Sequence, residues 1–308
     1  MTRPSYFTYK NIVALLIVLA MGCCVIWWLS GQDSSESARL PKDSSDKLQV
    51  VVSSYVPYTL AQSIGGEQVQ LSMLVPPGAE PHHFEPTPGS IISVEQADVF
   101  LYTSLQAEPW VGSILSGLSD VNAVEIAAVE PTEDPHVWMT PYGALSMAQV
   151  ISQALVKADP AHKSYYRKNL RQFEKQIEAL HQDFASGLAH CKHKTIIHIG
   201  HLAFGPLAQT YGLELEALAG VTHQGEHSVR RLTQLVRRIR SKKAAAIFSE
   251  EMLPPDLART VALETNVRVL PLYTVEEVGK EDFDQGVGYE TYMRRNLKNL
   301  QEGLQCPA

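Results

Sequence analysis

Residues 76–88 read Pro-Pro-Gly-Ala-Glu-Pro-His-His-Phe-Glu-Pro-Thr-Pro and place two imidazoles, His82 and His83, between prolines after a predicted strand, Val69 to Val75. Proline fixes φ and biases the preceding residue toward extended geometry, so these histidines are expected on a stiff loop. A stiff loop suits a metal-ligating or catalytic histidine. A solvated turn with incidental histidines is the alternative, and residues elsewhere in the chain have to decide between the two.

The size and composition predict a globular protein of about two domains behind an N-terminal tail, because the chain has 308 residues of which 45% are hydrophobic. The net charge of −7 and the isoelectric point near 5.9 argue against a nucleic-acid-binding protein, since phosphate binding needs a basic surface. The basic residues from Arg230 to Lys243 are spaced along a predicted helix. We interpret them as a solvated face, with a docking surface as the alternative.

The N-terminus predicts export. Residues 1–30 are interpreted as a signal or membrane anchor, because Ile12 to Leu29 is a run of 18 uncharged residues, long enough to span a bilayer, behind a basic start. An uncleaved anchor, a cleaved signal and a lipid on Cys23, which follows Ala-Met-Gly, remain open. Residues 31–47 are polar and predict a flexible linker. The remainder is expected to be extracytoplasmic, in the periplasm or at the cell surface, and tethered to the membrane.

Alternating strand and helix patterns predict an α/β protein of two lobes, each with a mainly parallel sheet flanked by helices. We expect an N-terminal lobe over residues 48–158, a long connecting helix over 159–190 and a C-terminal lobe over 191–308. The long helix is predicted from apolar residues that recur every three or four positions: Tyr166, Leu170, Phe173, Ile177, Leu180, Phe184 and Leu188. It would be a rod between the lobes, with a coiled coil as the alternative.

Four candidate metal ligands each follow a predicted strand, two in each half of the chain: His82 after 69–75, His136 after 123–126, His201 after 195–199 and Glu276 after 267–272. Open parallel sheets bind their ligands beyond the carboxyl ends of the strands, so these side chains are expected to converge between the lobes. Three imidazoles and one carboxylate are a typical tetrahedral set for Zn²⁺. Mn²⁺, which prefers more oxygen ligands, is the less favoured alternative.

Neighbouring residues compete with these candidates. Glu250, Glu251 and Glu277 are rivals of Glu276 as the fourth ligand, and water is another; one of Glu250 and Glu251 could instead cap a helix. We interpret His83 as a solvated neighbour of the site and His198 as a hydrogen-bonded core residue.

One pair of cysteines and one further pair of histidines could also have a role. Cys191 and Cys306 would be the only exported cysteines and could form a disulfide in an oxidising compartment, although two thiols that never meet are the alternative. His223 and His227 lie in a predicted loop and are weaker candidates for metal binding.

Six motifs of this chain, taken together, are specific enough to indicate a protein family. They are residues 75–88, Glu-Pro-Trp at 108–110, Asp-Pro-His-Val-Trp-Met at 134–139, Gly-His-Leu-Ala-Phe at 200–204, Tyr-Gly-Leu-Glu at 211–214 and Tyr-Met-Arg-Arg-Asn-Leu at 292–297. With them, the chain from about Leu48 to Leu304 resembles the solute-binding proteins of zinc and manganese ABC transporters, the TroA-like or ZnuA-like metal receptors.

The resemblance carries the family's ligand positions over to His82, His136, His201 and Glu276, in a pattern that looks like the zinc branch. It implies a monomeric receptor, not an enzyme, that captures Zn²⁺ and hands it to an ABC permease for import. Because histidines bind metal only when neutral, the affinity is expected to fall below about pH 6.5. Proteins of other classes remain as alternatives: a zinc hydrolase with Glu276 or Glu250 as general base, or an adhesin stabilised by metal.

Overall fold

The structure is a computed structural model that describes residues 47–119, 121–127, 134–218 and 229–307, without the side chains of Val229 and Arg231. The predicted anchor and all of the predicted linker except Lys47 lie outside the described residues. In the part of the chain that is described, helices long and apolar enough to cross a membrane are absent.

The first half of the described chain forms a sheet of four parallel strands in the order β2-β1-β3-β4. These strands are β1 (Leu48–Val52), β2 (Val69–Met73), β3 (Val99–Tyr102) and β4 (Ala123–Glu125), and the associated helices are α2 (Tyr55–Gly65), α3 (Pro88–Gln96), α4 (Val111–Gly117) and α5 (Pro141–Ala158). Val50 and Val52 of β1 join the core of α2 and α5, whereas Val51 joins the core of α3 and α4. From Val50 to Val52 the strand is apolar and buried, because both faces of the sheet are covered there.

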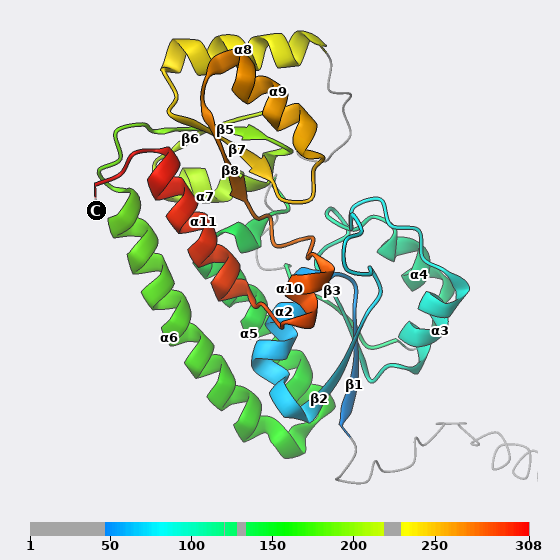
Figure 1. Cartoon of the computed structure of the whole chain (residues 1–308). Helices are drawn as coiled ribbons and strands as arrows, with labels where there is room; N and C mark the ends of the chain where they lie inside the picture. The colour runs from blue at the N-terminus through cyan, green and yellow to red at the C-terminus, as the bar shows by residue number, and fades with distance from the viewer. Residues whose placement is uncertain (1–46, 120, 128–133, 219–228, 308) are drawn as a thin grey trace, which may run out of the picture. The chain divides into compact units, whose positions relative to one another are not determined.

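The second half repeats this arrangement with the strand order β6-β5-β7-β8, again all parallel. Its elements are β5 (Thr195–Ile199), α7 (Gly205–Thr210), β6 (Glu214–Ala217), α8 (Val229–Lys242), β7 (Ala246–Glu250), α9 (Pro255–Thr265) and β8 (Arg268–Leu272). Ile197 and Ile247 join the core of α8 and α9, whereas Ile196 and Phe248 join the main core. Figure 1 shows α8 and α9 on one side of this sheet. The predicted fold of two parallel-sheet lobes is therefore confirmed.

The long helix is α6 (Lys163–Leu188), preceded by a 3-10 turn at Pro160–His162, so it starts four residues after the predicted limit at 159 and ends two residues before the one at 190. Its 26 residues give a length of about 39 Å. The predicted apolar stripe is buried, except for the partly buried Leu170. Helix α6 packs against α5, α2 and the C-terminal helix α11 (Tyr289–Gly303), which lie beside it in Figure 1. Helices of the same chain therefore cover the stripe, and α6 is the predicted rod between the two sheets.

Two helices contribute to the first half in ways that the strand and helix patterns do not specify. Helix α2 begins at Tyr55 and contains Pro57, which is tolerated in a first turn, where backbone N–H groups need no helical partner. The short helix α10 (Lys280–Asp284) was not predicted; it packs on α2 through Phe283, whose ring centroid lies 5.1 Å from that of Tyr58. The limits of the lobes at 158/159 and 190/191 stay a prediction.

A disulfide joins Cys191 and Cys306, which are separated by 115 positions in the sequence. Cys191 follows the end of α6 and Cys306 follows the end of α11. The predicted pairing is therefore confirmed, and the bond ties together the ends of two helices that also pack against each other.

Removing this disulfide should destabilise the protein substantially, because a bond that closes so long a loop strongly restricts the unfolded chain. We expect Cys191→Ser to lower the free energy of unfolding, measured by denaturant titration, by about 2–5 kcal/mol. The double variant with Cys306→Ser serves as the control and should lose no more than the single variant. Equal stability of the wild-type protein with and without reductant would contradict the prediction.

Candidate metal centre

The structure brings the four predicted residues, His82, His136, His201 and Glu276, into one buried cluster. One ligand atom from each lies within 4.8 Å of all the others, and none of the four residues is more than 6% exposed. Each residue follows the carboxyl end of a strand, namely β2, β4, β5 and β8. The topology of the two parallel sheets thus brings together residues that are almost 200 positions apart in the sequence.

The carboxylate of Glu276 lies at the centre of the cluster. Its Oε1 atom is 3.3 Å from Nε2 of His82 and 3.0 Å from Nε2 of His136, and its Oε2 atom is 3.3 Å from Nε2 of His201. The Nε2 atoms of His136 and His201 are 3.2 Å apart. In a tetrahedral site with metal–ligand bonds of about 2.0–2.1 Å, the ligand atoms are about 3.3–3.4 Å apart. These four contacts are close to that spacing, and the ligand atoms all lie within 4.8 Å of one another, so the cluster is compact enough for a four-coordinate zinc site.

The other ring nitrogen of each histidine is held by an oxygen. Nδ1 lies 2.6 Å from the carbonyl oxygen of Ala107 in His82 and 2.7 Å from Oδ1 of Asp134 in His136. In His201, Nδ1 contacts Oε1 of Glu250. An acceptor at Nδ1 fixes the ring and favours the tautomer whose Nε2 carries a free lone pair. All three Nε2 atoms are thereby prepared to bind a cation.

Glu250, the predicted rival of Glu276, therefore has a different place in the structure. Its Oε1 atom accepts from the backbone N–H of His201 at 3.3 Å as well as contacting the ring. This close fit requires glycine at position 200, because a Cβ atom there would lie 2.6 Å from Cδ of Glu250 and 2.5 Å from Cε1 of His198. Glu250 supports His201 and does not belong to the four-residue cluster.

The donor set suits a metal cation. Nε2 of His82 and Oε1 of Glu276 are buried and face each other at 3.3 Å, and neither makes a well-formed hydrogen bond within the described residues. A buried polar atom left without a partner is costly, whereas a divalent cation would satisfy these lone pairs together. The site therefore fits a metal ion by burial, by donor chemistry and by the distances between its ligand atoms.

The electrostatics of the metal-free cluster follow from the buried carboxylate. Burial alone would lower the pKa of His82 and of His201, but Glu276 outweighs this effect and raises them to about 9 and about 10. Burial would raise the pKa of Glu276, but the neighbouring imidazoles, His136 foremost, hold it well below its usual range. Without metal, protons on the histidines therefore balance the carboxylate.

The other predicted residues lie around the cluster. The side chain of His83 is 46% exposed and bonds to Glu80 at 2.9 Å, as expected of a neighbour that points away. His198 is fully buried, with Nδ1 3.0 Å from the carbonyl oxygen of His201. Glu277 is half-buried, and its burial, together with the charge of Glu276, raises its pKa to about 7. His223 and His227 lie outside the described residues.

The groups that hold the histidines in place were not predicted from the sequence. Asp134 could have been predicted from its position two residues before His136, because a short carboxylate side chain at that spacing can contact the histidine ring. The Ala107 carbonyl carries no side-chain signal, and its role depends on the loop after β3 folding over His82. Trp110 ties that loop to the histidine loop, because its indole N–H donates to the carbonyl of Pro81 at 2.7 Å.

The fold and the site together define a two-lobed binding protein with a buried candidate metal centre between parallel sheets. The family model described as ZnuA, zinc-uptake complex component A, periplasmic, matches residues 50–303. The chain therefore belongs to this family of uptake-system components, and the expectation that it is not an enzyme is confirmed at the family level.

Individual relatives are similar to this chain over most of its length. The high-affinity zinc uptake system protein ZnuA of Bacillus subtilis is 30% identical, over 96% of this chain and 98% of its own length. The zinc-binding lipoprotein AdcA of Streptococcus pneumoniae is 29% identical over 85% of this chain, which spans 56% of that longer protein. The crystal structure of the Zn(II)-bound ZnuA-like domain of that AdcA superposes with a TM-score of 0.76 at 28% identity, covering 84% of this chain and 99% of the domain.

Replacing the central carboxylate should reverse the histidine pKa shifts. In metal-free Glu276→Gln, burial still disfavours the imidazolium ions while the main compensating charge is gone, so the pKa of His82 and of His201 should fall from about 9 and about 10, with the smaller contribution of Glu250 to His201 remaining. NMR titration of the histidine ring protons measures these values. Unaltered titration of His82 would contradict the electrostatic account.

Proposed function

We propose that this protein is the extracytoplasmic receptor of a zinc importer: it captures Zn²⁺ at His82, His136, His201 and Glu276 and delivers the ion to an ABC permease. The observation that carries the proposal is the convergence of three imidazole Nε2 atoms on one buried carboxylate, each ring held at Nδ1 by an oxygen. Membership of the zinc-uptake family supports the transport role.

Zinc is favoured over manganese by the ligand chemistry. Three nitrogen donors and one carboxylate match the preference of Zn²⁺ for a tetrahedral site of nitrogen and oxygen ligands, whereas Mn²⁺ is better served by more oxygen donors. The contacts of 3.0–3.3 Å between ligand atoms also suit a small four-coordinate ion.

A catalytic zinc ion needs an open coordination position for water, which distinguishes it from a captured ion. In the proposed site Glu276 would take the fourth position, and Glu250 is engaged with His201 and so is not placed as a general base. This arrangement supports binding and release of the ion itself as the function.

The proposal includes an N-terminal tether and a monomeric receptor. The uncharged run from Ile12 to Leu29 and Cys23 after Ala-Met-Gly support an anchor or a lipid, and one relative is named a lipoprotein. A tethered receptor stays close to its permease, which raises the effective concentration of one at the other.

Metal competition tests the proposal directly. Protein stripped of metal with a chelator and then equilibrated with equal concentrations of Zn²⁺ and Mn²⁺ should retain one zinc ion per chain, measured by mass spectrometry of the metal content. His201→Ala should lose tight binding, because one of the four donors is gone.

Two adjacent histidines give a matched pair for the same measurement. His82→Ala should abolish tight zinc binding, because Nε2 of His82 faces Glu276 within the cluster. His83→Ala should bind zinc like the wild-type protein, because its ring pairs with Glu80 instead. Preferential retention of manganese, or an equal loss in both histidine variants, would overturn the assignment.

Zinc affinity should increase with pH across the neutral range. With pKa values of about 9 and about 10, His82 and His201 are protonated at pH 7 without metal, and Zn²⁺ must displace these protons. Lower pH therefore weakens binding, and the gain in affinity should continue to about pH 9. This differs from the expectation of a fall only below about pH 6.5, which assumed ordinary imidazoles. Affinities measured by chelator competition from pH 6 to 9 test this, and a constant affinity would contradict it.

A further inference from the structure

The segment that carries Glu276 connects β8 with α10, and its backbone is held at both ends by the N-terminal half of the chain. The indole N–H of Trp138 donates to the carbonyl of Thr274 at 2.9 Å, and the backbone N–H of Gly78 donates to the carbonyl of Val278 at 2.9 Å. These carbonyls lie two residues before and two residues after Glu276. Although Glu276 belongs to the C-terminal half of the sequence, its segment is bonded to the loops that carry His136 and His82.

The backbone conformation between these two hydrogen bonds is energetically unfavourable on its own. Val275 has a φ of +65° and is buried. A β-branched residue rarely adopts this left-handed conformation, because its Cβ atom crowds the backbone, so surrounding contacts have to impose it. Asn296 of α11 adds a third restraint, because its side-chain amide bonds both the N–H and the carbonyl of Tyr273 at 2.8 Å.

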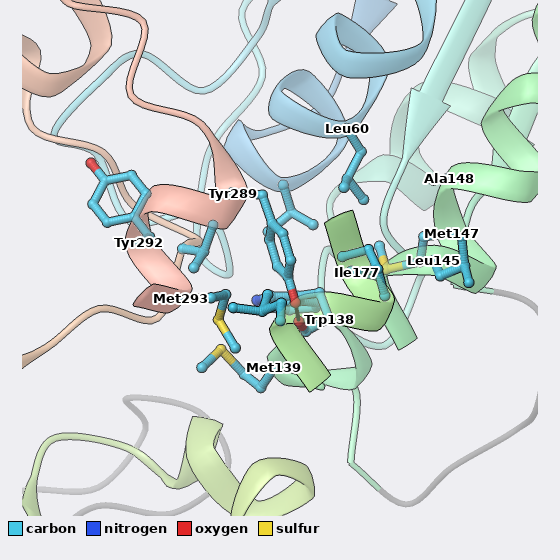
Figure 2. Close-up of a cluster of buried hydrophobic side chains, with 14 of the residues drawn as sticks. Leu60, Trp138, Met139, Leu145, Met147, Ala148, Ile177, Tyr289, Tyr292 and Met293 are labelled. Atoms are coloured by element: carbon cyan, nitrogen blue, oxygen red, sulfur yellow. Dashed lines mark hydrogen bonds between the residues drawn. The ribbon is translucent and has the colours of Figure 1, made fainter. Parts of the chain in front are cut away.

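Trp138 is itself rigidly placed. It is 1% exposed and lies in the core cluster of Figure 2, where the hydroxyl of Tyr289 donates to the Trp138 carbonyl at 2.7 Å. Its ring packs edge-on against that of His136, with centroids 5.3 Å apart. A single buried side chain therefore contacts one candidate ligand directly and holds the backbone beside another.

We propose that Trp138 is the positioning residue for Glu276: its indole N–H holds the Glu276 segment beside His136 and so sets the affinity of the site. This inference rests on the proposed function, because it takes Glu276 as a metal ligand. Without the N–H bond, the segment around Val275 relaxes and the carboxylate leaves its place among the histidines.

The test is the zinc affinity of Trp138→Phe in the full chain, measured by competition with a chromophoric chelator. Phenylalanine keeps an aromatic ring beside His136 but removes the donor to Thr274. Groups that orient metal ligands typically contribute about 10–100-fold in affinity, and we expect a loss in this range. In a Glu276→Gln background, the same substitution should change the affinity by less than about 2-fold, because the group it positions is already gone.

Trp110→Phe is the matched control. The indole of Trp110 makes an equivalent bond, to the carbonyl of Pro81 beside His82. Its removal should weaken zinc binding equally in the wild-type and Glu276→Gln backgrounds, because it acts through a different ligand. Only Trp138→Phe should lose its effect when Glu276 is replaced.

Trp138→Phe could fail to fold, which denaturant unfolding of the metal-free protein would reveal. Tyr289→Phe is the second variant that tests the inference in that case. It leaves the indole in place and removes the hydroxyl that holds the main chain of Trp138, so it should give a smaller loss that likewise vanishes in Glu276→Gln.

The inference is overturned if Trp138→Phe binds zinc normally, or if its loss is the same in both backgrounds. If Glu276→Gln alone leaves the affinity unchanged, the ligand assignment falls together with this inference. A strong effect of Glu276→Gln without an effect of Trp138→Phe overturns the positioning role alone.

Discussion

The site depends on one buried charge, the carboxylate of Glu276. It is 4% exposed and lies 3.0–3.3 Å from an Nε2 atom of each of three histidines. A carboxylate at such depth requires positive charge beside it, which protons on the imidazoles or a divalent cation can supply. Protons and metal therefore balance the same charge, and the same geometry explains both the raised histidine pKa values and the capacity to bind zinc.

The fold supports this charge by using parallel sheets twice. Both sheets have the same strand order, and the loops beyond their carboxyl ends supply all four residues of the cluster. Backbone segments and side chains outside the cluster then fix each ring: the Ala107 carbonyl, Asp134 and Glu250. Since a ring held at Nδ1 loses little freedom when Nε2 binds metal, the arrangement favours tight binding by preorganisation.

The two halves of the chain are held together by more than the cluster. Helix α6 packs with α5, α2 and α11, and the disulfide between Cys191 and Cys306 links the regions that follow α6 and α11. Helix α11 also supplies Tyr289 and Asn296, which support Trp138 and Tyr273 near the site. The packing that makes α6 and α11 a rigid frame therefore also limits how far the Glu276 segment can move.

The alternation of strands and helices, the long apolar stripe of α6 and the three histidines of the cluster were predicted from the sequence, because hydrophobic periodicity and residue position after a strand are local properties. Glu276 was the favoured fourth residue, but Glu250, Glu251 and Glu277 remained open beside it. Asp134 could also have been found from its spacing to His136. Only the tertiary structure decided that Glu250 supports His201 and that His83 faces Glu80. It also decided that Trp138 bonds to Thr274, 136 positions away. Such contacts join segments distant in the chain, and their partners follow from how the sheets and helices pack.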